Sequence, residues 1–392
     1  MDSLENKERI AIVAVGYNRL YSLKRLLHSL ELAHYDVANV PLVISIDASG
    51  DEELYDFVRN YRWNFGTKYT IIQEKRLGLK NHIFACADLT RFFKAIILLE
   101  DDLYVSPFYY DYVQRTLDFY QGDSCVASIG LYSYSSNVYD FLPFSPFQTE
   151  YDVYCIQSTI TWGECWSERM WSNFKTWLNT NEPIKWESLD IPTVVKEFKR
   201  AWSKYFTAYL SETNRYVIAP YKSYTTNYME IGEHSSETIS SVQVPYVRRM
   251  EDLKFGKTGD LIKYDSFYNP VGLEKYLNVP QGELCVDFFS TRPNNRNCRY
   301  ILSTDILPYK IIQSYGLKTR PIETNIIDGI EGKGIYLYDV TAPDNKNRKD
   351  VNTITSIEYR LKMFRPQLLV KYIKHLIKNK ILNTIKAVFR IS

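Results

Sequence analysis

The sequence lacks a strong excess of charge of either sign. Its 48 Lys and Arg residues nearly cancel 46 Asp and Glu residues, which leaves a formal net charge of +2. A balance of this kind gives no general attraction for a polyanion, so we expect no nucleic-acid partner. The final segment differs, because nine basic residues and no acid follow Tyr359.

Paired cysteines and long apolar runs are also absent. The six cysteines include no Cys-x-x-Cys pair, which favours reduced thiols in a cytoplasmic protein. The start, MDSLENKERI, is polar, and only a short apolar run follows it. We therefore expect neither a signal peptide nor a membrane-spanning helix.

A regular alternation of strands and helices fills the first hundred residues. Four apolar runs are typical of buried strands, and the segments between them carry apolar residues at helical spacing. The expected strands cover 10–15, 40–47, 69–74 and 95–100, and the expected helices cover 20–33, 51–61 and 82–93. This order predicts an α/β fold with a Rossmann-like, doubly wound, mostly parallel sheet.

Length and pattern changes divide the rest of the chain. At 392 residues the chain exceeds a typical single domain. We expect a main domain over 1–245, a small α+β extension over 246–357 and a basic tail over 358–392. In the main domain, WGECWSERMW (162–171) indicates a turn leading into a helix. The extension has strand-like runs, including 298–317 and 332–342.

The tail has apolar residues at helical spacing with lysines on much of the other face. A basic amphipathic helix can lie at the surface of an anionic membrane. The alternative is a helix docked on the body by its apolar stripe.

Three consecutive acids follow the fourth expected strand, in IILLEDDLYVSPFYYDYV (96–113). Unpaired carboxylates are costly inside a core, whereas a ligand-binding rim can hold them. Ligands of doubly wound sheets bind beyond the carboxyl ends of the strands. We therefore expect one rim to gather the acids with the polar residues that follow the first two strands: Asn18, Arg19, Asp47, Glu100, Asp101 and Asp102.

Carboxylates at such a rim suit a divalent cation, because Mg²⁺ and Mn²⁺ prefer hard oxygen ligands. A plain solvated turn is the alternative. The 33 tyrosines also fit a carbohydrate partner, since aromatic rings stack on sugar faces, although each of them could equally serve packing.

Five segments in the same order resemble the N-acetylglucosaminyltransferase I family of GT-A glycosyltransferases. The acidic stretch resembles its metal-binding segment, AVGYNR its first strand, and LVISIDASGDEE its uracil-contacting segment. Further on, ITWGECW resembles the Leu-Gly-Trp loop beside the donor sugar, and NYMEIGEHS resembles a late glycine-containing loop. The likeness covers roughly residues 10 to 240.

The resemblance implies roles for the rim residues. Arg19 would contact a diphosphate and Asp47 the uracil, while Glu100 and Asp101 would face the ribose and the donor sugar. Asn18 belongs to the same nucleotide-binding rim.

The metal would be Mn²⁺ or Mg²⁺, with Asp102 as its direct ligand. His234 would lie on the metal or on phosphate, unless Ser235 takes that position.

One segment departs from the family. Its catalytic Asp belongs to a Trp-Asp-Asp-Trp segment, and the best match here, AWSKYF, has Ser203 and Lys204 instead. An inverting transfer requires a carboxylate base. Glu164 is the first substitute, although it could equally be an acid at a helix N-terminus, and Asp190 is the second.

These observations predict a metal-dependent glycosyltransferase with an inverting reaction. Its donor would be a nucleotide sugar, most simply a UDP-sugar, and its acceptor a glycan or a lipid-linked hydroxyl. Surface polysaccharide synthesis in the cytoplasm, at the inner face of the plasma membrane, would suit the basic tail.

Two other functions remain open. A sugar nucleotidyltransferase normally has a Gly-rich phosphate loop after the first strand, which VGYNRLYSL lacks. A protein that binds nucleotide sugars without catalysis would explain Ser203 and Lys204.

Overall fold

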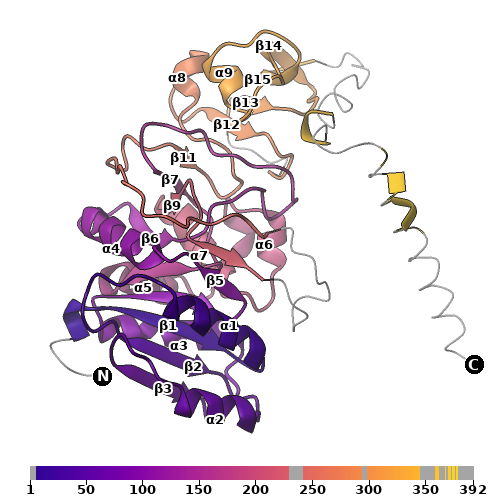
Figure 1. Ribbon diagram of the computed structural model, residues 1–392. Helices are drawn as coiled ribbons and strands as arrows, with labels where there is room; N and C mark the ends of the chain where they lie inside the picture. The colour runs from indigo at the N-terminus through magenta and orange to yellow at the C-terminus, as the bar shows by residue number, and fades with distance from the viewer. Residues whose placement is uncertain are drawn as a thin grey trace, which may run out of the picture.

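The computed structural model describes residues 6–228, 242–293, 298–344 and 358–361, together with residues 367, 370, 371, 373–375 and 377. Over this range the chain is elongated (Figure 1). The first strands lie at one end, a small sheet lies at the other, and the middle of a large sheet connects them.

The large sheet has nine strands in the order β11-β7-β9-β6-β8-β4-β1-β2-β3. Five of its pairings are parallel and three are antiparallel. Its strands are β1 (Ile10–Gly16), β2 (Leu42–Ile46), β3 (Lys68–Ile72), β4 (Ala95–Glu100), β6 (Val126–Gly130), β7 (Val153–Ile156), β8 (Glu164–Ser167), β9 (Tyr216–Pro220) and β11 (Lys263–Tyr264). This is the α/β, Rossmann-like and mostly parallel fold that the sequence predicts.

Each of the four predicted N-terminal strands is confirmed. All residues of β1 and β2, and all of β4 except Glu100, are buried, as expected of strands covered on both faces. The expected helices are also present, as α1 (Leu20–Glu31), α2 (Glu52–Asn60) and α3 (Leu79–Ala87). The third begins earlier than the apolar pattern indicates and ends in a 3₁₀ turn, Asp88–Arg91.

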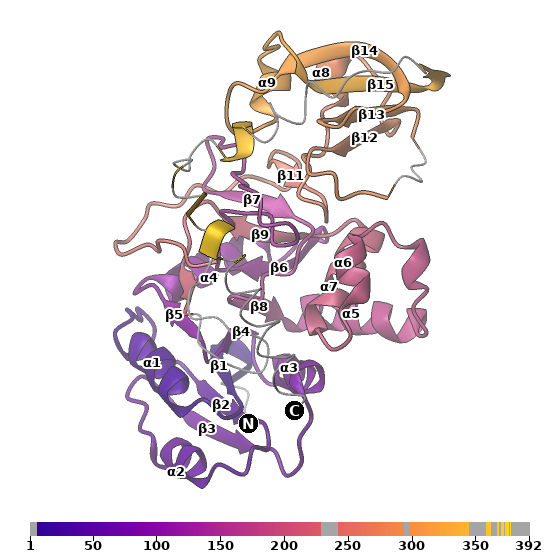
Figure 2. The same ribbon diagram turned by 90° about the vertical axis from the view of Figure 1, so that its right-hand side faces the viewer.

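Helices cover both faces of this sheet. Figure 2 shows α1 and α4 (Tyr109–Tyr120) on one side and α3, α5 (Glu168–Asn181), α6 (Thr193–Glu197) and α7 (Trp202–Thr213) on the other. Helices α1 and α3 thus cover opposite faces of the sheet, in the region where the strand order is β3-β2-β1-β4. This arrangement leaves an open crevice where β1 and β4 lie side by side, because their connections leave in opposite directions.

The segment 162–171 contains more than the predicted turn and helix. Residues Glu164–Ser167 form β8, which pairs antiparallel with both β4 and β6. Only then does α5 begin, where the Ser167 side chain accepts from the Met170 backbone N–H. The tertiary structure decides this strand, because its four residues fill the gap between two strands that are distant in sequence.

Two smaller sheets complete the fold. A two-stranded ribbon pairs β5 (Leu103–Val105) with β10 (Thr225–Asn227). The C-terminal sheet has the order β12-β13-β15-β14 and its own apolar core. Its elements are α8 (Glu274–Leu277), β12 (Leu284–Asp287), β13 (Tyr300–Ser303), β14 (Tyr309–Gly316), α9 (Thr324–Ile327) and β15 (Gly334–Pro343).

The main sheet continues beyond residue 245, the boundary expected from the sequence. Its edge strand β11 pairs with β7, so residues 263 and 264 belong to the large sheet rather than to the extension. The division at residue 245 stays a proposal about folding units, and the separate C-terminal sheet begins at Leu284.

The described part of the basic tail presents exposed apolar side chains. Val370, Ile373 and Ile377 are each at least half exposed, at 51%, 52% and 55%. Among the described residues, no helix has both the length and the apolar character needed to cross a membrane. Cys86, Cys125, Cys155 and Cys165 are free thiols.

Candidate functional site

A cavity of about 500 Å³ opens at the carboxyl ends of β1 and β4. These strands are neighbours with Val15 opposite Glu100, and their ends meet at the crevice where the helices change side. The predicted rim residues all line this cavity: Asn18, Arg19, Asp47, Glu100, Asp101 and Asp102. Whether they bind a nucleotide stays a prediction, but the structure brings them together.

Two of the three acids contact one guanidinium group. Arg19 forms two bonds to Asp101, one of them from Nε to Oδ2 at 3.3 Å, and its Nη1 lies 3.5 Å from Asp102 Oδ2. The side chain of Asp101 is 5% exposed, whereas those of Arg19 and Asp102 are each 25% exposed. Arg19 therefore neutralises the deeper acid and leaves Asp102 accessible from the cavity.

This cluster contains more acidic than basic side chains. Burial, followed by repulsion from Asp102 and Asp101, raises the pKa of Glu100. Burial also raises the pKa of Asp102, although Arg19 and Asn227 oppose the effect. Three carboxylates share one arginine, so an additional cation would relieve both the desolvation and the repulsion.

The carboxylate oxygens of this cluster suit a divalent ion that is coordinated partly by the protein and partly by a bound ligand. Among the described residues, no group of three or more His, Cys, Asp or Glu side chains forms a ready metal centre. Mg²⁺-type ions commonly take one or two carboxylates plus substrate phosphates instead of an all-protein cage. Asp102, with Glu100 beside it, offers that arrangement. The other predicted metal ligand, His234, lies outside the described residues, as does Ser235.

Asp47 has a structural task at the rim that the sequence did not reveal. Its Oδ1 accepts from the backbone N–H groups of Ala48 and Leu77 at 2.9 and 2.8 Å, and its Oδ2 accepts from Gly78 at 2.9 Å. Gly78 has φ +75°, a conformation that glycine adopts without strain. Asp47 therefore fixes the loop that begins α3 while still lining the cavity.

That loop and α3 add two cavity residues that sequence reasoning left out, Arg76 and His82. Arg76 is exposed, and its guanidinium lies 4.6 Å from the centre of the Tyr17 ring. His82 is buried, and its Nε2 lies 2.8 Å from Ser45 Oγ. Burial lowers the pKa of His82 despite the nearby Asp47. Both residues belong to the segment KRLGLKNH (75–82). Residues 80–82 of it lie near the position of the resembling family's nucleotide-binding helix, but their spacing from the acids differs from that of the family.

The opposite wall carries hydroxyl and aromatic groups. Thr159 Oγ1 lies 2.9 Å from Thr207 Oγ1 and donates to the Ser203 carbonyl at 3.1 Å. Tyr134 donates to the Thr159 carbonyl at 2.8 Å, and Trp162 packs against Tyr134. The cavity thus has a charged side at β1 and β4 and an uncharged side suited to sugar hydroxyls.

Glu164 does not reach the cavity, although the loop before it does through Thr161 and Trp162. The Glu164 side chain is enclosed in the sheet, accepts from Ser128 and is 1% exposed. Burial raises its pKa well above the ordinary range. This position does not fit the expected general base. Strand β8 lies between β4 and β6 in the sheet, and it holds the Glu164 carboxyl against Ser128 and away from the cavity.

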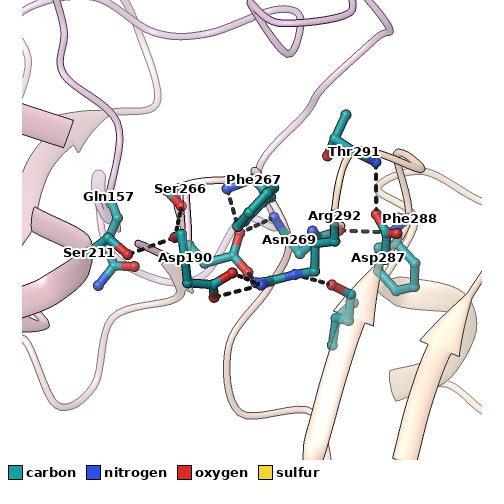
Figure 3. Close-up of polar contacts among 12 residues, drawn as sticks. Gln157, Asp190, Ser211, Ser266, Phe267, Asn269, Asp287, Phe288, Thr291 and Arg292 are labelled. Carbon is teal, nitrogen blue, oxygen red and sulfur yellow. Dashed lines mark hydrogen bonds and ion pairs between the residues drawn. The ribbon is translucent and has the colours of Figure 1, made fainter. Parts of the chain in front are cut away.

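The residues at the departing segment, Ser203 and Lys204, and the second substitute base, Asp190, also have assigned places. Ser203 lines the cavity, and Lys204 Nζ lies 3.9 Å from the Trp186 ring centre. Asp190 forms an ion pair outside the cavity, with Arg292 at 3.0 and 2.7 Å (Figure 3). None of the three places an acid at the cavity.

Comparisons with known proteins give low-level structural likenesses. A scan of family models and a search of curated proteins each found no match. Among solved structures, S. aureus TarS 1-349 in complex with UDP-GlcNAc is 16% identical with a TM-score of 0.40, over 59% of this chain and 62% of that one. This chain thus spans about three fifths of the length of that 1-349 chain.

Two further solved structures are similar over smaller parts. GalNAc-T7 with UDP, GalNAc and Mn²⁺ is 13% identical with a TM-score of 0.37, over 55% of this chain and 43% of that one. The mannosyltransferase PcManGT from Pyrobaculum calidifontis, with GDP-Man and Mn²⁺, is 11% identical with a TM-score of 0.31, over 42% and 45%. Likenesses at this level assign no substrate to the present chain.

Proposed function

We propose that this chain is a GT-A-type glycosyltransferase, which moves a sugar from a nucleotide sugar to a hydroxyl group of an acceptor. The observation that carries the proposal is the convergence of Arg19, Asp47 and the three acids on one cavity at the β1–β4 crevice. Such a crevice is the usual ligand site of doubly wound sheets.

The charged side of the cavity suits a nucleoside diphosphate. Arg19 and Arg76 can contact phosphate oxygens, since a guanidinium presents several N–H donors in a fixed plane. Asp102 and Glu100 would hold Mn²⁺ or Mg²⁺, which when bound supplies positive charge to the departing diphosphate. The donor proposed from the sequence is a UDP-sugar.

The uncharged side suits the transferred sugar and the acceptor. Thr159, Thr207 and Tyr139 line it, and Trp162 supplies an aromatic face. For inversion, as favoured by the sequence, a base must approach from this side. Among the described lining residues the carboxylates all lie on the charged side, so the anomeric configuration of the product is a direct readout of the mechanism.

The cellular role follows the sequence interpretation. We propose an acceptor that is a glycan or a lipid-linked sugar, as in surface polysaccharide synthesis, and contact of the basic tail with the cytoplasmic face of an anionic membrane. The exposed Val370, Ile373 and Ile377 are available for such a contact.

Donor hydrolysis with and without a divalent ion tests the enzyme proposal. A panel of UDP-, GDP-, CMP- and dTDP-sugars is incubated with Mn²⁺ or with EDTA, and nucleotide release is measured. We expect release from one nucleotide class, loss of release in EDTA and recovery with Mn²⁺. Asp102→Asn should lower the rate about 100-fold or more, by analogy with loss of one transition-state contact.

The matched control is Asp56→Asn on α2, where Asp56 is exposed and 3.0 Å from Arg59. Equal rates in Asp102→Asn and Asp56→Asn would contradict the role of Asp102. Nucleotide-sugar binding without release, and without transfer to any acceptor, would instead support the non-catalytic binding function, which the absence of an acid at Ser203 and Lys204 favours.

A further inference from the structure

A second hollow lies next to the proposed donor cavity. It has a volume of about 560 Å³ and is open to solvent along residues 133–135, 221–223 and 244–251. Tyr134, which is 3% exposed, lines both hollows. The segment that bounds the second hollow also reaches the first, through Val242. The two hollows therefore share a wall, and we call the second one the side groove.

Hydrogen bonds hold the walls of the side groove in place. Ser133 N–H donates to Ser223 Oγ at 3.1 Å, and Ser133 Oγ donates to the Tyr221 carbonyl at 2.9 Å. On the other wall, Val247 N–H donates to the Ser223 carbonyl at 2.8 Å. These bonds join three segments that are distant in sequence, so the groove is a formed surface that a ligand need not organise.

Three tyrosines connect the acidic cluster to the side groove. The Tyr104 ring lies 5.9 Å from that of Tyr228 and 5.7 Å from that of Tyr246. Tyr228 is 38% exposed, and its backbone N–H donates to the Asp102 carbonyl at 2.7 Å. Tyr246 lines the side groove. This tyrosine row offers ring faces of the kind that stack on sugars.

The rim of the side groove has an excess of positive charge. Lys222, Arg248 and Arg249 line it with one acid, Glu251. Lys222 and Arg249 share that acid at 2.8 and 3.1 Å. Arg248 is exposed and donates to Tyr246 OH at 3.1 Å. One carboxylate cannot neutralise three cations, so the rim attracts an anion.

We propose that the side groove and the tyrosine row bind the acceptor, and that this acceptor is a sugar chain bearing negatively charged groups. The inference rests on the proposed glycosyl transfer and specifies its substrate class. Sugar rings stack on Tyr246 and its neighbours, while carboxylate or phosphate groups of the chain pair with Arg248 and Arg249. The end of the chain enters the donor cavity past Tyr134.

Matched dextran probes test this assignment. Fluorescent plain, carboxymethylated and phosphorylated dextran fragments of equal length are titrated with the protein, and binding is followed by anisotropy. We expect both charged probes to bind about tenfold more tightly than the plain one, and high salt to weaken only the charged probes. The two charged arms distinguish a carboxylate-bearing chain from a phosphate-bearing one.

Variants then locate the binding surface. The double substitution Arg248→Glu with Arg249→Glu should weaken the charged probes about tenfold. Tyr246→Ala should weaken all three probes severalfold, and Tyr246→Phe should restore them, because stacking needs the ring and not the hydroxyl. Arg62→Glu, at an exposed arginine of the 61–67 segment, is the charge control.

The proposal is overturned by equal binding of plain and charged probes, by no binding of any probe to the folded protein, or by equal effects of the groove and Arg62→Glu substitutions. A UDP-induced rise in melting temperature with Mn²⁺ is measured in parallel and should be the same in all variants. If the groove substitutions leave probe binding unchanged while the UDP shift is intact, the acceptor site alone is overturned. Absence of a shift with any nucleotide overturns the proposed function.

Discussion

Two clusters in this molecule each contain one arginine in contact with two aspartates, but one opens onto a cavity and the other is largely enclosed. In the cavity at the β1–β4 crevice, Arg19 contacts Asp101 and Asp102. Between the large sheet and the C-terminal sheet, Arg292 contacts Asp190 and Asp265. Each cluster is one arginine between two aspartates, yet only the first lies at the crevice of the sheet.

The second cluster is closed by further contacts. Arg292 is 10% exposed, donates to the Val286 carbonyl at 2.9 Å and lies 4.1 Å from the Phe267 ring centre. Figure 3 shows Arg292 and Asp190 reaching toward each other from two separate segments. Two aspartates, a backbone carbonyl and an aromatic ring contact this side chain, so it stabilises the junction and offers a ligand little surface.

The first cluster is left incomplete. A third acid, Glu100, shares the single arginine, and burial and repulsion raise its pKa. The comparison shows that an arginine between two acids indicates a candidate ligand site only where the cluster keeps uncompensated charge and opens onto a cavity. Three sets of substitutions test this difference between the two regions.

The largest expected effect comes from Arg292→Ala. It leaves Asp265, whose side chain is 15% exposed, as a buried acid without its cation, and should lower the free energy of unfolding by about 3–5 kcal/mol. Asp190→Asn is the matched control, because Asp190 is 68% exposed and exposed pairs contribute about 1 kcal/mol or less. Urea unfolding measures both. Similar losses in the two variants would show that the junction does not depend on the buried pair.

The second effect is a dependence on pH at the same junction. Glu323 is 4% exposed and bonds to Tyr264 OH, and burial raises its pKa to about 7. The folded state therefore holds this proton more tightly than the unfolded state, so stability falls as pH rises from about 4.5 to 7.

Glu323→Gln should remove about 3 kcal/mol of the change in unfolding free energy between pH 4.5 and 8. Urea unfolding at a series of pH values gives the slope. The exposed carboxylate variant Glu53→Gln, on α2, should keep the slope of the original protein. An unchanged slope in Glu323→Gln would show that this carboxyl titrates normally.

The smallest expected effect is a difference in how strongly an added cation stabilises variants of the two clusters. Arg19→Ala removes the cation that contacts Asp101 and should lower the melting temperature in EDTA. Mn²⁺ at ten times its Kd should restore about 1.4 kcal/mol, because the acids face the cavity. Arg292→Ala should gain no more from Mn²⁺ than the original protein does. Equal rescue of both variants would contradict a cation site at the acidic cluster.

Periodicity predicted the first four strands because their burial on both faces leaves near-continuous apolar runs. The same pattern put the acids at a strand end, and chain order put Arg19 and Asp47 at the ends of neighbouring strands. Strand β8 had no comparable signal, since four residues are too few to show a period and their pairing partners are distant in sequence.

The tasks of individual side chains were less predictable. Asp47 appeared as a ligand contact, but three backbone N–H groups of two segments bond to it. Glu164 appeared as a base beside the donor, but the register of β8 encloses it between β4 and β6. Such roles depend on which segments approach a residue, which no local pattern contains.

The sequence by itself determined the α/β alternation and the collection of polar residues at the ends of adjacent strands, because both follow from local spacing and the geometry of parallel sheets. Only the tertiary structure decided that Arg19 contacts two of three clustered acids at an open cavity, that Arg292 is largely enclosed, and that a tyrosine row leads to a second groove. These features arise where segments distant in sequence meet, and packing between them sets the exposure and charge of each group.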